Sequence, residues 1–379
     1  MSIYLDNNAT TAIDPAVREM MLRYLGSEAG NPSSRHASGR WARQGVEEAC
    51  EKIAEGLDVN VDEITFTSGA TEANNLAILS WRRDPSVVYV SATEHPSALL
   101  PAESLASFGH DVRVLTVDEE GLVDLSDIDS ADARGVIQWA NSETGTIQEL
   151  ITSSSSPDWK SLHVDGVQAV GKVPISFRAI KANTLSFSGH KIHGPPGIGA
   201  LLVRKGTSID PLLLGGSQQA GIRPGSEPVA LIAGLGEAVR LATISLAQNQ
   251  QIMRERRDFL ESALAARVPQ IVVHGSRDHR LPGTLNVSFL GAKAEAVLMG
   301  LDLAGVRASA GTACASGSME PSPTLVAMGL AREQVMSAIR FSVSRQTTAD
   351  DIIQAIDVIE HVVEKIRAKM SVYPADSSS

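Results

Sequence analysis

The chain has 379 residues, of which 43% are hydrophobic and 20% are charged, and its formal net charge is −11 at pH 7. This length predicts two domains, or one large α/β unit with an appendage, and the composition is that of a globular protein. The negative charge argues against a nucleic-acid partner, because phosphate binding needs clustered Lys and Arg.

The N-terminal segment, MSIYLDNNATT, has neither the basic region nor the apolar region of a secretory signal. No apolar run approaches the roughly 18 residues that span a bilayer. The two cysteines, Cys50 and Cys314, cannot form a disulfide framework. We therefore expect a soluble protein of a reducing compartment, the cytoplasm, without a membrane partner.

Short runs rich in Val, Ile, Leu and Thr recur through the first 260 residues, with helical patterns between many of them. Several of these runs are apolar on both faces, which is typical of buried strands in a parallel sheet. Cys50 falls within one helical pattern, residues 41–57, where a buried structural thiol is expected. The expected strands are residues 64–69, 86–92, 112–118, 135–141, 161–166, 184–189 and 199–205.

The pattern changes from Glu227, where a long helical stretch extends to Arg267. Strand-like runs, a helix near 293–304, the Cys314 loop and a final strand and helix follow. This order predicts a smaller α+β domain. We expect an N-terminal arm (1–15) belonging to the small domain, a large domain (16–260), and a small C-terminal domain (261–379).

The stretch TFTSGATEANN, residues 65–75, is a candidate phosphate site. A strand runs into Ser68-Gly69-Ala70, and a helix is expected to begin at Thr71. A turn of small residues that leads into a helix presents free N–H groups to an anion. The alternative is an ordinary helix N-terminus capped by Thr71.

The stretch HVDGVQAVG, residues 163–171, places Asp165 at a strand end and Gln168 three residues later. Both are expected to face the crevice at the carboxyl end of the sheet. Residues 166–172 also fit the pattern G-x-x-x-x-G-K, but Val173 stands where a P-loop needs Ser or Thr. We therefore disfavour a nucleotide-triphosphate site.

The stretch LSFSGHKIHGPPGIG, residues 185–199, places Lys191 just after a buried strand. Desolvation there lowers the pKa of an amine and makes it a nucleophile, whereas the alternative is a solvated surface charge. His190 and His193, with His163, would be a metal site only if a helix aligned them. Neither such a helix nor a carboxylate motif is indicated, so no metal is expected.

Cys314 lies in the glycine-rich stretch GTACASGSMEP, residues 311–321, where no apolar core surrounds it. A thiol in such a loop can move, and it reacts only as the thiolate, from a starting pKa near ~8.5. Downstream, Arg340 on a strand-like run is suited to bind a carboxylate bidentately. The alternative for Arg340 is a surface salt bridge.

Together these four sites resemble the cysteine desulfurases, pyridoxal-phosphate enzymes of the class V aminotransferase group. The resemblance covers nearly the whole chain and also includes the segments YLDNNATT (4–11), GNPSSRH (30–36), TEHPS (93–97), NSETG (141–145) and IRFSVSR (339–345). It implies fold type I, an α/β fold with a mostly parallel seven-stranded sheet, helices on both faces, and a smaller α+β domain.

The resemblance also implies residue roles. Lys191 would hold pyridoxal 5'-phosphate as a Schiff base, Asp165 would pair with the pyridine nitrogen, and His95 would stack on the ring and assist proton transfer. Gln168 would bond the ring hydroxyl. The phosphate would be bound by Ala70, Thr71, Ser188 and His190, together with Ser226 from the other subunit of a homodimer. The substrate would be bound by Asn31, Ser142 and Arg340.

By the same resemblance, Cys314 attacks the sulfur of L-cysteine, becomes a persulfide and leaves L-alanine. The persulfide then passes to an acceptor protein, and the sequence CASGSMEPS most resembles the group that supplies iron–sulfur scaffolds. Three positions depart from the family pattern: Ser142 replaces Asn, Gln219-Ala220 replaces Glu-Arg, and Pro196 replaces Lys. The alternatives are a selenocysteine lyase, another class V transaminase, lyase or epimerase, and a non-enzymatic scaffold.

Overall fold

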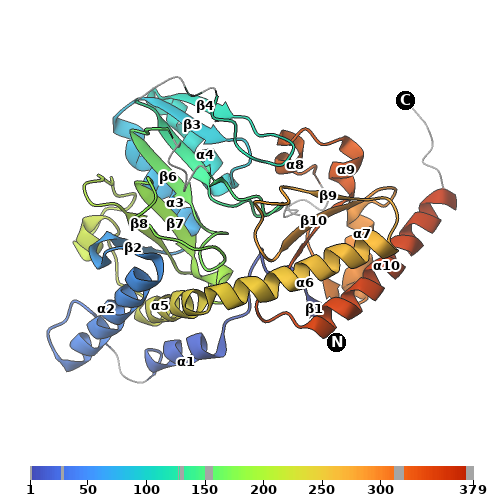
Figure 1. Cartoon of the computed structure of the whole chain (residues 1–379). Coiled ribbons are helices and arrows are strands. Elements are labelled where there is room, and N and C mark those ends of the chain that lie inside the picture. The colour runs from blue at the N-terminus through green and yellow to red at the C-terminus, as the bar shows by residue number, and fades with distance from the viewer. Residues whose placement is uncertain are drawn as a thin grey trace.

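A seven-stranded sheet forms the centre of the larger part of the molecule (Figure 1). The computed structural model describes residues 2–26, 30–126, 128, 132–149, 157–310 and 320–372, without the side chains of 370–372. The sheet has the order β2-β8-β7-β6-β5-β3-β4, and only β8 runs antiparallel to its neighbours, which confirms the predicted fold class. Its strands are β2 (Ile64–Thr67), β3 (Val87–Ser91), β4 (Asp111–Leu115), β5 (Arg134–Gln138), β6 (Ser161–Asp165), β7 (Thr184–Ser188) and β8 (Gly199–Val203).

Helices cover both faces of this sheet, because successive strand residues point to opposite sides. Leu202 packs in the core beneath α1 (Pro15–Arg23), α2 (Ala37–Leu57) and α5 (Val229–Ile244). Its neighbour Leu201 packs under α3 (Ala70–Leu79), and α4 (Pro96–Ser104) covers β3 and β5 on the same face. Cys50 of α2 is half-buried rather than fully buried, and burial raises the pKa of its thiol to about 11.

A second, antiparallel sheet has the order β12-β10-β9 and its own core. Helices from both the middle and the end of the chain pack on it, and the N-terminal strand β1 pairs in parallel with β11 beside them. The elements are β1 (Ile3–Tyr4), β9 (Ile271–His274), β10 (Thr284–Phe289), β11 (Val306–Arg307), β12 (Ala338–Ser342), α6 (Leu246–Arg267), α7 (Ala294–Leu303), α8 (Pro323–Ala327), α9 (Arg332–Ser337) and α10 (Ala349–Val372).

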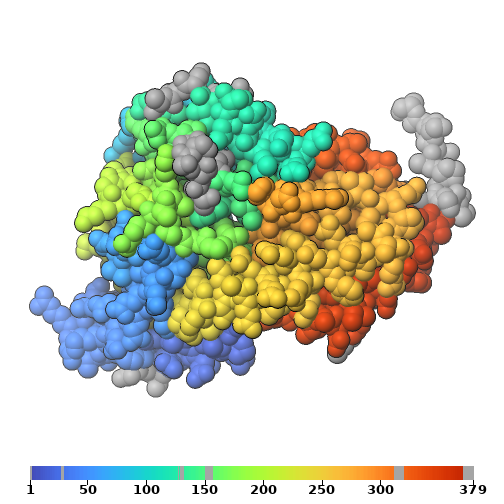
Figure 2. All heavy atoms as spheres, viewed as in Figure 1, coloured from blue at the N-terminus to red at the C-terminus, as the bar shows by residue number. Residues whose placement is uncertain are grey.

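The predicted long helical stretch is two helices, α5 and α6, bent by 74° at Ser245. The bend is needed because α5 packs on the large sheet, whereas Met253, Leu260 and Leu264 of α6 belong to the second core. The expected domain boundary after residue 260 falls within α6, so its position stays a prediction. In Figure 2 the orange and red C-terminal residues form one side of the molecule, and yellow α6 runs along it.

Among the described residues, no single helix is long and apolar enough to cross a membrane; α5 and α6 reach that length and composition only as a bent pair.

Candidate active site

A cavity of about 560 Å³ opens at the carboxyl ends of the parallel strands, where ligands bind in open α/β sheets. Most of the predicted site residues line it, including those that follow β2, β3, β5, β6 and β7. The predicted residues in its wall are Ala70, Thr71, His95, Ser142, Asp165, Gln168, Ser188, His190, Lys191 and Arg340.

Two predicted site residues are not in this wall, and a third lies outside the part of the chain that the structure describes. Asn31 and Ser226 are exposed and do not line the cavity of this chain. For Ser226 the expected cavity is that of a second subunit, which one chain does not test. Cys314 lies outside the described residues.

Lys191 ends a single 3₁₀ turn, Gly189–Lys191, that follows β7 directly. Its Nζ donates to the main-chain oxygens of Asn8 (2.6 Å) and Ala9 (2.8 Å). Burial, and next the charge of Arg340, lower the pKa of Lys191 to about 8. A minority of its amine, much larger than for an exposed lysine, is therefore neutral and nucleophilic at physiological pH.

This pKa predicts how fast the cofactor-free protein takes up an aldehyde cofactor. Only the neutral amine attacks a carbonyl, so the rate should rise about tenfold per pH unit below 8 and level off above it. Stopped-flow absorbance of pyridoxal phosphate mixed with the cofactor-free protein, from pH 6 to 11, measures this. Dividing by the rate of the same reaction with free Nα-acetyl-lysine, expressed per neutral amine with its ordinary pKa of about 10.4, removes the titration of the cofactor itself. A rate still rising to pH 10.5, the ordinary value for lysine, would contradict it.

Asp165 is buried at the end of β6, and its carboxylate accepts two hydrogen bonds. Oδ1 accepts from the Val167 amide at 3.0 Å, and Oδ2 accepts from Nδ2 of Asn74 at 2.8 Å. Oδ1 of Asn74 in turn faces Nε2 of His163 at 3.0 Å. Because burial lowers the pKa of His163 to about 3, this ring is neutral, and its Nε2–H donates to Asn74. The chain of bonds therefore orients the Asp165 carboxylate.

The three histidines considered for a metal site each have other partners. His163 bonds Asn74 and Thr184, whereas Nδ1 of His193 lies 2.9 Å from the main-chain oxygen of Ala12. Within the part of the chain that the structure describes, no group of three or more His, Cys, Asp or Glu residues is placed to hold a metal ion.

The turn after β2 has the backbone geometry that suits an anion. Helix α3 begins at Ala70, one residue earlier than expected, and its N-cap is Gly69, which offers no side-chain cap; Thr71 is therefore not the cap. The first N–H groups of a helix have no partner within the helix, so those of Ala70 and Thr71 are available to an anion in the cavity. Gly199 makes room for this turn, since a Cβ there would meet Cα of Gly69 at 2.9 Å.

Two histidines beside this turn carry no charge. His95 is the N-cap of α4, and its Nδ1 accepts from the Ser97 amide at 3.1 Å, which leaves the proton on Nε2. Burial lowers the pKa of His95, and it lowers that of His190 to about 4. A neutral ring such as that of His95 can stack on a cofactor and exchange a proton with it.

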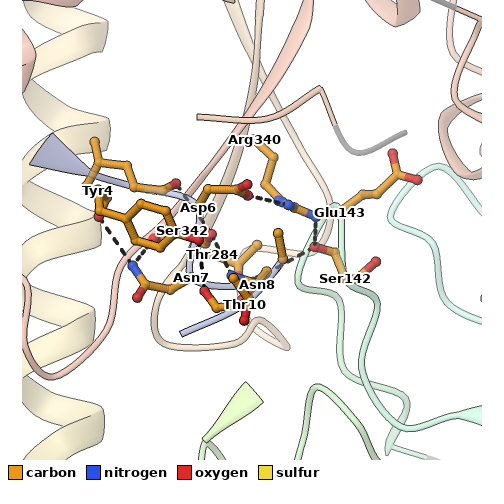
Figure 3. Close-up of polar contacts among 12 residues, drawn as sticks. Tyr4, Asp6, Asn7, Asn8, Thr10, Ser142, Glu143, Thr284, Arg340 and Ser342 are labelled. Atoms are coloured by element: carbon orange, nitrogen blue, oxygen red, sulfur yellow. Dashed lines mark hydrogen bonds and ion pairs between the residues drawn. The ribbon is translucent and has the colours of Figure 1, made fainter. Parts of the chain in front are cut away.

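Arg340 reaches the cavity from β12 of the second sheet (Figure 3). It donates from Nη2 to Oδ1 of Asp6 at 2.6 Å and from Nη1 to the main-chain oxygen of Ser142 at 3.1 Å. Its Nε is buried and has no partner among the described residues. Each Nη nitrogen carries a second hydrogen beyond the bond described, so a guanidinium fixed in this way in a cavity wall suits a substrate carboxylate.

The Arg340→Lys substitution tests this assignment. A lysine keeps the charge but loses the fixed fork of donors, so the KM for L-cysteine should rise roughly 10- to 100-fold, with a much smaller change in kcat. Steady-state alanine formation measures both. An Arg307→Lys variant, changed on neighbouring β11, is the matched control; an equal effect in both variants would remove the assignment.

Asn8 is a site residue whose role the sequence did not reveal, although the motif YLDNNATT contains it. Its main-chain oxygen accepts from Lys191, and its Nδ2 donates to the Ser142 oxygen (3.1 Å) and to Oγ1 of Thr284 (2.9 Å) (Figure 3). The only available signal was the motif itself, because these partners lie far away in the sequence.

The three departures from the family pattern have different surroundings. Arg340 contacts the main-chain oxygen of Ser142, so this contact does not depend on the identity of the side chain at position 142. Pro196 lines the cavity. Gln219 bonds the main chain of Phe66 on β2 through both side-chain atoms, at 2.5 and 3.0 Å, and therefore covers the edge of the sheet.

Comparison with known proteins agrees with this geometry. The sequence model of the family "Aminotransferase class-V" matches residues 3–354. Cysteine desulfurase IscS of Dictyoglomus turgidum is 40% identical over 376 residues, which cover 96% of this chain and 95% of that protein.

Two solved structures are also similar. One NifS-like protein has a TM-score of 0.88 at 31% identity, covering 96% of this chain and 100% of that one. The structure described as SspA in complex with cysteine has a TM-score of 0.79 at 30% identity, covering 92% and 100%.

The chain therefore belongs to the class V aminotransferase family. Within that family it is a pyridoxal-phosphate-dependent cysteine desulfurase, which confirms the predicted family, cofactor and activity.

Proposed function

We propose that this cavity holds pyridoxal phosphate and L-cysteine, with the roles that the resemblance assigns. The observation that carries the proposal is the convergence, in one cavity wall, of a lysine with a lowered pKa, a buried carboxylate and a free helix N-terminus. The bound cofactor supplies an electron sink for the carbon atoms of the substrate.

The residues around it have distinct tasks. The amine of Lys191 would hold the cofactor, and it is the group that would take up the Cα proton of the substrate. The Asp165 carboxylate would pair with the ring nitrogen, and His95, whose pKa burial lowers, would stack on the ring. The N–H groups at the start of α3, with Ser188 and His190, hold the phosphate, and Arg340 holds the substrate carboxylate.

The sulfur-transfer step belongs to Cys314. Its thiolate attacks the sulfur of bound L-cysteine; the new S–S bond forms as the Cβ–S bond breaks, and that electron pair stays on carbon, where a proton completes alanine. The sum is cysteine plus a thiol giving alanine plus a persulfide, so no outside oxidant is needed.

Chain connectivity supports this role. Ser309 lines the cavity, and the five residues from there to Cys314 reach at most about 17 Å. On the other side of the loop, the hydroxyl of Ser322 donates to the buried carboxyl of Glu143 at 2.6 Å, next to Ser142 in the wall. Both flanks of the loop are therefore anchored beside the cavity.

The deciding experiment compares wild type with Cys314→Ala, supplied with L-cysteine and a thiol reductant. We expect equal amounts of alanine and sulfide from wild type and, in a parallel sample without the reductant, a persulfide of +32 Da on the peptide with Cys314. All three should be lost in the variant. Cys50→Ala is the matched control and should behave as wild type. Alanine formation that survives in Cys314→Ala would contradict the assignment.

We further propose a homodimer in which Ser226 contributes to the phosphate site of the partner subunit. We also propose that a protein such as an iron–sulfur scaffold accepts the persulfide. The relative named IscS supports an acceptor, and exposed Ser226, which does not line its own cavity, supports the dimer. The net charge of −11 favours a protein over a nucleic acid. A reducing compartment such as the cytoplasm suits a thiol nucleophile. Light scattering of the holoenzyme tests the dimer, and a monomer would contradict it.

A further inference from the structure

Lys172 is a buried lysine behind the cavity, and none of the tasks above uses it. It follows the turn after β6, and it lines a small internal cavity of about 30 Å³ together with Lys191. Its Nζ lies 2.5 Å from Oε1 of Gln168 and 3.1 Å from Oδ1 of Asn8.

These two contacts fix the orientation of the Gln168 amide. An amino group that donates needs an acceptor, and a side-chain amide has only one accepting atom, its oxygen. Oε1 of Gln168 therefore faces Lys172, and its Nε2 faces the opposite way, where it donates to the main-chain oxygen of Asn8 at 3.0 Å. Gln168 also lines the active-site cavity, so the orientation of its amide bears on that site.

The same argument applies to Asn8. Its Oδ1 faces Lys172, so its Nδ2 must donate on the other side, to Ser142 and Thr284. This holds the Asn8 main-chain oxygen where it accepts from both Lys191 and Gln168. The amino group of Lys172 thus determines which atoms of Gln168 and Asn8 donate and which accept beside Lys191.

Lys172 has no competing role as an ion-pair partner. Among the ion pairs of the described residues, none includes Lys172, and its charged neighbours Lys191 and Arg340 are cations. His193 and His190 are also near Lys172. Burial lowers the pKa of each to about 4, so neither ring carries a charge. Burial, followed by the charge of Lys191, lowers the pKa of Lys172 to about 7. Burying an ammonium group without a carboxylate partner costs folding free energy. If this position only filled the core, an apolar side chain such as methionine would be more stable there.

We infer that Lys172 is a positioning residue of the cofactor site: it orients Gln168 and Asn8 so that their polar atoms face the cofactor and Lys191. The inference rests on the proposed location of the cofactor in this cavity.

The test is a double-mutant cycle with Lys172→Met and Gln168→Met. Methionine keeps the length and apolar stem of both side chains and removes only the polar contacts. We would measure the dissociation constant of pyridoxal phosphate for each cofactor-free protein, and the wavelength of the visible band after loading. The control is Lys181→Met, which changes an exposed lysine further along the chain that pairs with Asp158.

Each single variant should bind the cofactor roughly tenfold more weakly, and the double variant also about tenfold rather than 100-fold, because Lys172 acts on the cofactor mainly through Gln168. The band of Lys172→Met should shift as that of Gln168→Met does, and Lys172→Gln, which keeps a donor, should lie between it and wild type. Additive losses, or wild-type binding by Lys172→Met, would overturn the inference. If Lys172→Met does not fold, the same cycle with Lys172→Gln decides. A wild type that binds no cofactor would instead refute the proposed function.

Discussion

Replacement of Lys191 by alanine should lower the rate of alanine and sulfide formation by at least about 10³-fold, near the upper range for a positioned acid–base group. The substitution removes both the amine that binds the cofactor and the base that takes up the Cα proton. Burial makes this amine reactive: its pKa of about 8 leaves a neutral fraction at physiological pH that an exposed lysine lacks. Product assays and the visible absorption of the loaded protein measure the two losses separately.

A matched variant distinguishes chemistry from folding. Lys205→Ala changes another lysine near the end of a neighbouring strand of the same sheet and should behave as wild type. Added ethylamine should restore part of the activity of Lys191→Ala, since a small amine can enter the space left by the side chain. If Lys191→Ala retains more than a tenth of the wild-type rate, Lys191 is not the catalytic base.

Asp165→Asn should reduce kcat by about 10² to 10³-fold while the protein still binds the cofactor through Lys191. The change removes the negative charge that stabilises a protonated ring nitrogen. It also places an amide nitrogen against one of two donors, the Val167 amide or the Asn74 side chain, so one hydrogen bond is lost. Steady-state rates and the absorption spectrum test both parts of this expectation.

The neighbouring Asn74 provides the comparison for Asp165→Asn. Asn74→Ala removes one hydrogen bond to the carboxylate but keeps its charge, and it should cost much less activity. Equal losses in Asp165→Asn and Asn74→Ala would mean that orientation, rather than charge, is what the carboxylate provides.

Much of the large sheet was predictable because its strands are buried on both faces. Residues 87–90 of β3, for example, are all apolar, and such runs indicate a buried strand of a parallel sheet. Asp165 and Lys191 were predictable for the same reason, since each follows one of these runs at its carboxyl end. These features are local in the sequence.

The features that were not predicted depend on contacts between distant segments. Nothing near Asn8 indicates that Lys191, Lys172 and Ser142 surround it, and nothing near Lys172 indicates that its amine faces two amides. The bend at Ser245 was missed because neither Gly nor Pro marks it; the separate cores on which α5 and α6 pack produce it.

The position of the N-terminal arm has a consequence for synthesis of the enzyme. Asn8 reaches Lys191 only if the arm is in place, and the arm is held by partners from the end of the chain: the Ser342 hydroxyl accepts from the Asn8 amide at 2.9 Å, and β1 pairs with β11. The N-terminal arm is synthesised first, but its partners are synthesised more than 300 residues later, so the arm can take its final position only then. Contacts of such long range form late in folding. A nascent chain that has completed the large sheet therefore still lacks a finished catalytic centre, and cofactor capture is a late event in maturation.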